Sequence, residues 1–159
     1  MTKTKAQQIM AATEARAADD VTAAIKDIAT EFEPYIIKQR RHFHKHPELS
    51  LAEERTTSDI ANQLDAMNIP YERPLKTGLV ATLRGTAPDA YREDGTPRRR
   101  ILLRADIDAL PVTERNDCEW RSQNEGVMHA CGHDMHAAVL FGVLKTFAEA
   151  PDFRATLFG

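Results

Sequence analysis

Apolar side chains recur every three or four positions in the first third of the chain, as they do on one face of an amphipathic helix. This spacing predicts a helix from Val21 that ends before the pair His46–Pro47, because a residue before proline resists the helical conformation. Residues 1–20 are polar and rich in alanine, and we expect a helical or frayed extension there. The predicted buried face consists of Val21, Ile25, Ile28, Phe32, Tyr35, Ile36 and Phe43.

A second helical pattern follows Pro47 and is expected to end near Asn68. Ser50 and Glu53 have the spacing of a capping box, in which each of the two residues satisfies a free amide at the helix start. The apolar stripe of this helix is predicted to contain Ile60, Ala61, Leu64 and Met67.

Short apolar runs in the middle of the chain predict strands at Leu79–Leu83 and Ile101–Asp106. The polar stretch 86–99 between them, with its prolines and an Asp-Gly turn, predicts a surface loop. A third helix is expected to open at His133–Asp134 and to stop at Pro151, with a further strand over Arg154–Phe158. The expected buried face of this helix contains His136, Leu140, Val143, Leu144 and Phe147.

Helices that alternate with buried strands indicate an α/β fold with a mixed sheet flanked by helices. The last predicted strand meets the end of the chain without a following helix, so we expect an incomplete domain. A strand edge and apolar sheet surface left uncovered in this way would lower solubility.

Composition and charge narrow the class of protein. The chain has 159 residues, of which 42% are hydrophobic and 28% charged, with a net charge of −3. These values fit one domain, or a piece of one, and exclude a disordered chain. They offer no basic surface for nucleic acid or an anionic membrane, and no apolar run reaches the length of a membrane span. The first residues lack the apolar core of a secretion signal, so we expect a cytoplasmic protein.

Three histidines, a cysteine and a carboxylate gather in the stretch 128–136. Cys131 and His133 are two positions apart around Gly132, and side chains at this spacing can face the same way. Thiolate and imidazole are good ligands for borderline-soft divalent metals, so the pair favours a metal site. A nucleophilic thiol beside a histidine, a disulfide between Cys118 and Cys131, and a buried structural cysteine remain the alternatives.

Carboxylates also occur at the end of the predicted strand Ile101–Asp106, where α/β proteins often place their ligand crevice. Asp106 is a candidate to orient a metal-bound imidazole, and Asp108 a candidate to cap the following turn. His136 is interpreted as a packed core histidine. His44 and His46 are interpreted as structural residues that bond to free carbonyls at a helix end.

Several of these stretches, in the same order, resemble the M20 metallopeptidase family, and more narrowly its amidohydrolase branch of aminoacylases, hippurate hydrolases and auxin-conjugate hydrolases. The resemblance runs from about Arg40 to the C-terminus. It is carried by Arg40–Ser50, Thr77–Ala81, Leu103–Pro111 and Gly126–His136.

The resemblance implies the N-terminal portion of a zinc-peptidase-like catalytic domain over residues 21–159. It implies a metal-dependent hydrolase that cleaves amide bonds of N-acyl amino acids or small peptides, with two Mn or Zn ions per full-length site. Cys131 and His133 match metal ligands, and Asp106 matches the acidic residue that supports the metal-binding imidazole. His136 matches a position without a ligand role. The full-length form is expected to be a homodimer.

The Glu-Glu pair of the family, which supplies the general base, and its later histidine ligands and lid domain have no counterpart in this sequence. Two hypotheses follow. In the first, the chain is part of a metal-dependent amidohydrolase and is inactive by itself. In the second, it is a non-catalytic fragment that at most binds a metal or a partner.

Overall fold

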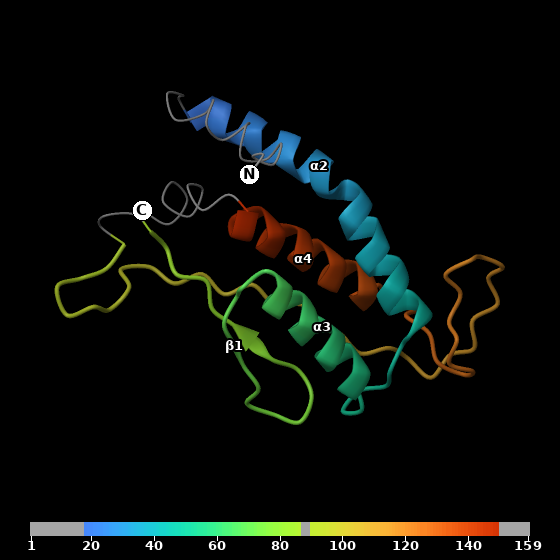
Figure 1. Cartoon of the computed structure of the whole chain (residues 1–159). Helices are drawn as coiled ribbons and strands as arrows, with labels where there is room; N and C mark the ends of the chain where they lie inside the picture. The colour runs from blue at the N-terminus through green and yellow to red at the C-terminus, as the bar shows by residue number, and fades with distance from the viewer. Residues whose placement is uncertain (1–17, 87–89, 150–159) are drawn as a thin grey trace. The chain divides into compact units, whose positions relative to one another are not determined.

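The computed structural model describes residues 18–86 and 90–149 (Figure 1). The described elements, in chain order, are α2 (Ala18–Lys45), α3 (Glu54–Ala66), β1 (Tyr71–Glu72), β2 (Val80–Ala81) and α4 (His133–Glu149). The chain divides into two compact units, and both α2 and α4 continue from one unit into the other. The first unit comprises Met1–Pro34, Arg84–Leu102 and Gly142–Gly159, and the second comprises Tyr35–Leu83 and Leu103–Phe141.

The first unit has a small apolar core. Ile28 and Phe32 are buried on α2 as predicted, and Ala24, which was not part of the predicted face, is buried beside them. The ammonium of Lys145 lies 5.1 Å from the centre of the Phe32 ring, and the same lysine pairs with Glu149 one helical turn later.

The second unit holds the elements that carry the candidate site. The Tyr35 hydroxyl donates to the Gln63 Oε1 atom at 2.9 Å, which joins α2 to α3. The rings of Phe43 and Phe141 stack with 5.9 Å between their centres, which joins α2 to α4. The other buried apolar residues of this unit are Ile60, Ala61, Leu64, Ile69, Ala109, Val127, Ala137 and Ala138.

The first two helices are confirmed, but the predicted capping box is wrong. α3 begins at Glu54, and Glu53 stands at its N-cap without a side-chain hydrogen bond to the helix. The carboxylate of Glu48 caps the helix instead: it accepts the amides of Arg55 at 3.2 Å and Thr56 at 2.7 Å. A turn at Leu51, whose φ is +67°, moves the helix start beyond the reach of Ser50.

The predicted strands are shorter than expected or missing. From Leu79–Leu83 only β2 forms, and it pairs antiparallel with β1. Ile101–Asp106 forms no strand, and Leu102 is 86% exposed. A strand exists only where its amides and carbonyls pair with a neighbour, and within the described residues nothing pairs with this segment. The strand expected at Arg154–Phe158, the stop at Pro151 and most of the extension 1–20 lie outside the described residues.

α4 begins at His133 as predicted, but its buried face differs from the predicted one. Asp134, Ala137, Ala138 and Phe141 are buried, whereas His136 is exposed. The prediction of His136 as a core histidine is therefore wrong. Apolar spacing alone predicted the wrong buried face for this helix, because the buried residue at its start, Asp134, is a carboxylate and not an apolar side chain. Neither this helix nor the other described ones is long and apolar enough to span a membrane.

Candidate metal centre

Backbone pairing brings together the two stretches of the sequence that contain the candidate site residues, one around Asp108 and the other at 128–136. Leu110 and Met128 exchange two hydrogen bonds, Leu110 N to Met128 O at 3.0 Å and Met128 N to Leu110 O at 3.1 Å. This antiparallel bridge sets the segment of Asp108 beside the loop that leads into α4. Gly132, with φ +89°, supplies the left-handed conformation through which this loop enters the helix.

His133 is held by one carboxylate, and its second ring nitrogen has no hydrogen-bond partner among the residues that the structure describes. Its Nδ1 atom donates to Asp108 Oδ1 at 2.8 Å and also lies 3.1 Å from the Asp108 carbonyl oxygen. A carboxylate only accepts hydrogen bonds, so the proton of the neutral ring stays on Nδ1 and Nε2 presents a lone pair. Among the described residues, none bonds to that Nε2 atom. Metal-binding histidines are oriented in this way.

Cys131, two positions before His133, is an exposed free thiol, and Cys118 is a half-buried free thiol. The sulfur of Cys131 is therefore accessible to a ligand. The two expected metal ligands lie at the end of one loop and the first position of the following helix, so both depend on how that helix start is fixed.

Asp106 lies apart from this histidine contact. Its carboxylate accepts two hydrogen bonds from the Arg104 guanidinium, at 2.6 and 3.1 Å, and the pair is largely exposed. The carboxylate that contacts His133 is Asp108, which the sequence had offered only as a turn cap. Asp106 and Asp108 are two positions apart, so an extended chain presents both to the same side. Strand periodicity could not distinguish them.

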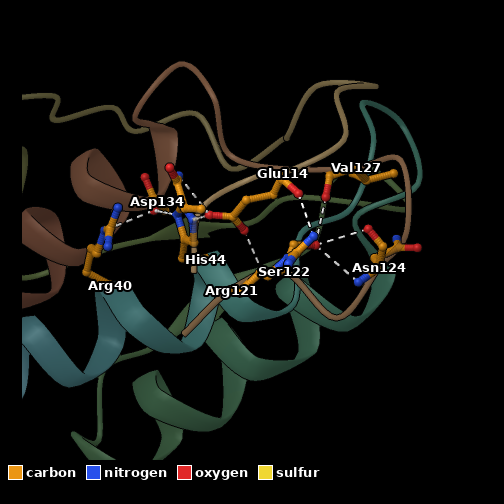
Figure 2. A network of polar contacts seen from close by, with 9 residues as sticks. Arg40, His44, Glu114, Arg121, Ser122, Asn124, Val127 and Asp134 are labelled. Atoms are coloured by element: carbon orange, nitrogen blue, oxygen red, sulfur yellow. Dashed lines mark hydrogen bonds and ion pairs between the residues drawn. The ribbon is translucent and has the colours of Figure 1, made fainter. Parts of the chain in front are cut away.

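A buried polar network lies next to the start of α4 (Figure 2). We define the His44 network as Arg40, His44, Glu114 and Asp134. His44 Nδ1 donates to Asp134 Oδ2 at 2.7 Å, and His44 Nε2 donates to Glu114 Oε1 at 3.0 Å. Arg40 forms an ion pair with the same Asp134 oxygen at 3.1 Å. His44 is thus structural as predicted, but its partners are carboxylates and not helix-end carbonyls.

Glu114 connects this network to a polar loop. Its Oε2 atom accepts the Ser122 amide at 2.6 Å, and its backbone carbonyl accepts Arg121 at 2.7 Å. Burial alone would raise the pKa of Glu114, but the hydrogen bonds from Ser122, His44 and Asn116 outweigh burial and hold the pKa below its ordinary value. Glu114 is therefore a carboxylate at neutral pH. Sequence reasoning missed this residue, because a lone glutamate in a polar loop carries no signal.

His129 is a second buried imidazole close by. It is 5% exposed, its ring centre lies 6.4 Å from that of His44, and neither ring nitrogen has a hydrogen-bond partner among the described residues. Burial lowers the pKa of His129, and the neighbouring Asp134 opposes this only in part. The imidazole of His129 therefore has a buried donor and a buried acceptor that no described residue uses.

The donors present fit a divalent metal ion in kind, though incompletely in number. Cys131 and the Nε2 atom of His133 are the donor types that borderline-soft metals prefer. Within residues 18–86 and 90–149, no cluster of three or more His, Cys, Asp or Glu side chains is placed to surround one ion. A catalytic metal normally takes three protein ligands. The described residues thus offer two donors of a suitable kind, fewer than such a centre normally takes.

Comparison with known proteins places the chain in a family. The model of "Peptidase family M20/M25/M40" matches residues 102–157, which include both expected ligands. The chain belongs to the M20 peptidase family. The M20 resemblance of the sequence is therefore confirmed.

Individual relatives agree with this assignment. An uncharacterized hydrolase of Staphylococcus haemolyticus is 48% identical over 118 residues, which are 74% of this chain and 28% of that protein. The Bacillus subtilis YXEP protein, described as a dinuclear metal-binding peptidase from the M20 family, has a solved structure that matches with a TM-score of 0.65. It is 37% identical over 75% of this chain and 32% of its own.

A second solved structure, of a protein from methicillin-resistant Staphylococcus aureus, matches with a TM-score of 0.68 and 36% identity. It covers 80% of this chain, and this chain covers 32% of it. The chain therefore spans about a third or less of the length of these M20 relatives. Its fold corresponds to part of their structure.

Proposed function

We propose that Cys131 and His133 are ligands of a two-metal centre in a hydrolase that cleaves amide bonds of N-acyl amino acids or small peptides. One observation carries the proposal: Asp108 holds the Nδ1 proton of His133, which leaves Nε2 free two residues after an exposed thiol. Membership of the M20 family supports the hydrolase class. The description of the B. subtilis neighbour supports two metal ions.

The residues of this chain would bind and orient, and Asp108 would do the orienting. By accepting from Nδ1 it keeps His133 in the tautomer that binds metal, and it fixes the plane of the ring. Divalent ions bound there would lower the pKa of a water molecule and polarise the scissile carbonyl. Zn²⁺ suits a thiolate ligand better than Mn²⁺ does, because thiolates are soft donors.

The proposal gives the supporting role to Asp108, whereas the family resemblance assigns it to Asp106. The two carboxylates differ in their contacts: Asp108 reaches His133, and Asp106 pairs with Arg104. A homodimer and a cytoplasmic location remain predictions of the same proposal for the full-length protein.

Cobalt binding tests the two ligands, because a thiolate bound to Co²⁺ gives a charge-transfer absorption band. We expect the purified 159-residue chain to show this band, Cys131→Ser to lose it, and His133→Gln to bind Co²⁺ more weakly. Cys118→Ser is the matched control, since it removes the other thiol, and it should leave the band unchanged. A band that is lost with Cys118→Ser and kept with Cys131→Ser would overturn the proposal.

We further propose that the chain alone does not hydrolyse substrate and, by itself, acts only as a metal-binding piece. The reason is the shortage of ligands: two donors come from the described residues, whereas a catalytic metal usually has three. Incubation of the cobalt- or zinc-loaded chain with an N-acetyl amino acid should release no free amine. Metal-dependent release of the amino acid would contradict this part of the proposal.

A further inference from the structure

We propose that the His44 network is a positioning device for the metal ligands, in which His44 sets the metal affinity of Cys131 and His133 without contacting the metal. The inference rests on the proposed function. The imidazole of His44 contacts Glu114 and Asp134, and Arg40 pairs with the same Asp134, which directly follows His133 (Figure 2).

Both ring nitrogens of His44 are used by carboxylates. Both carboxyl groups therefore depend on this one ring for a buried hydrogen bond. Together with Arg40, His44 balances the polar groups of Asp134 and Glu114. The side chains of His44, Asp134 and Glu114 are at most 5% exposed, so this balance is made away from water. Removing one partner of such a buried pair destabilises the fold, because the other partner is left buried without compensation.

Asp134 transmits the constraint to the helix. Its Oδ2 atom is held by His44 and Arg40 of α2, and its Oδ1 atom accepts the Met135 amide at 2.9 Å. The first turn of α4 is therefore fixed from α2 through a single carboxylate. The backbone of His133 and the loop of Cys131 enter the helix at this turn, so their side chains inherit its position.

Glu114 extends the same constraint to the polar loop through the Ser122 amide. Ser122 in turn donates its hydroxyl to the Val127 carbonyl at 2.7 Å. Val127 directly precedes Met128, whose backbone pairs with Leu110 next to the Asp108 segment. His44 thus holds the candidate centre from both sides: through Asp134 at the helix start, and through Glu114 and Ser122 at the loop.

Cobalt affinity of the variant His44→Gln tests the inference. A glutamine amide cannot donate to both carboxylates in the geometry of the ring, so the helix start loses its fixed position. Residues that orient metal ligands commonly change metal affinity by about 10–100-fold, and we expect a loss of at least about tenfold with a weaker thiolate-to-cobalt band.

His42→Gln is the matched control. It also removes an imidazole from α2 that contacts a carboxylate, Asp59 at 2.8 Å, but it leaves Asp134 and Glu114 untouched. We expect its cobalt affinity and absorption band to equal those of the unmodified chain. Circular dichroism establishes that each variant is folded. If His44→Gln does not fold, Glu114→Gln, which preserves the size of the side chain, takes its place with the same expected direction.

The outcomes separate the two proposals. If the unmodified chain binds cobalt through Cys131 and folded His44→Gln binds it equally well with the same band, His44 only stabilises the fold and the inference is overturned. A lower melting temperature alone would not rescue it. If the unmodified chain binds no cobalt, the proposed function fails and the inference fails with it.

Discussion

Two imidazole–carboxylate pairs with almost equal nitrogen–oxygen distances lie close to one another in this protein. They differ in burial and in whether the second ring nitrogen has a partner. His44 and Asp134 are 2.7 Å apart with side chains 5% and 1% exposed, whereas His133 and Asp108 are 2.8 Å apart with side chains 26% and 27% exposed. The ring of His44 has a protein partner at each nitrogen. The ring of His133 has partners only at Nδ1 in the described part of the chain.

The difference shows that the second nitrogen, and not the hydrogen-bond distance, separates a structural histidine from a ligand. A ring with both nitrogens used has no lone pair to offer and stabilises its surroundings. A ring with one nitrogen held and the other free is oriented for a ligand. The buried pair therefore fixes the helix start, and under the proposed function the more exposed pair orients a metal ligand.

The sharpest test of this comparison removes one carboxylate from each pair. Asp134→Ala removes the partner that buried His44 shares with the partly exposed Arg40, and loss of one member of a buried pair costs about 3–5 kcal/mol. Asp108→Ala affects a pair open to water, which contributes about 1 kcal/mol or less. Urea unfolding of both variants measures the two free energies. Equal losses would remove the distinction between the pairs.

Metal affinity should depend strongly on Asp108, although stability does not. Asp108→Asn replaces the carboxylate that accepts from His133 Nδ1 with an uncharged amide, a weaker acceptor, and we expect a loss of about 10–100-fold in cobalt affinity with little change in stability. Asp106→Asn is the matched control, because it changes an equal group two positions away that pairs with Arg104. A larger effect of Asp106→Asn would return the supporting role to Asp106, as the family resemblance implied.

These two aspartates illustrate where sequence reasoning succeeds and where it stops. The motif 128–136 identifies the ligand types and the start of α4, because ligand spacing and helix patterns are local properties. The choice between Asp106 and Asp108 depends on the backbone bridge of Leu110 with Met128, which joins residues 18 positions apart. Nothing in the local pattern carries that information.

The same limit explains the errors in the fold. α2 and α3 were predictable from apolar spacing, because each buries an apolar stripe. The buried face of α4 was not, because its rotation follows from the contact of Asp134 with a residue 90 positions earlier. Ile101–Asp106 has the composition of a strand, but composition cannot supply the neighbouring strand that pairing needs.

Acid unfolding examines Glu114, the second carboxylate that contacts His44. The pKa of Glu114 lies below its ordinary value in the folded chain, so the unfolded chain takes up the proton more readily. Glu114 therefore contributes stability that is complete above its ordinary pKa and is lost as the pH falls through the lower, folded value. We expect Glu114→Gln to be less stable at neutral pH and to lose less stability from about pH 5 downward.

The exposed glutamate Glu119, in the same loop, provides the control. Glu119→Gln should reproduce the acid unfolding of the unmodified chain. If Glu114→Gln and Glu119→Gln show the same dependence of unfolding free energy on pH, the Glu114 carboxylate does not take part in a buried charge balance.

A third imidazole–carboxylate pair should give the smallest response and so calibrates the other two. His42 and Asp59 are 2.8 Å apart with side chains 38% and 31% exposed, so His42→Gln should change the unfolding free energy by less than about 1 kcal/mol. Burial, then the charges of Arg55 and His42, lower the pKa of the neighbouring His46. His42→Gln removes one of these charges.

The pKa of His46 should therefore move upward, towards its ordinary value, in a titration followed by nuclear magnetic resonance. His44→Gln serves as the comparison, because His44 is not among the groups that lower the pKa of His46. A rise in both variants would mean that loosening of the helix end, and not the charge of His42, controls His46. A rise with His42→Gln alone would show that the His42 pair, which is open to water, acts on its neighbour by charge.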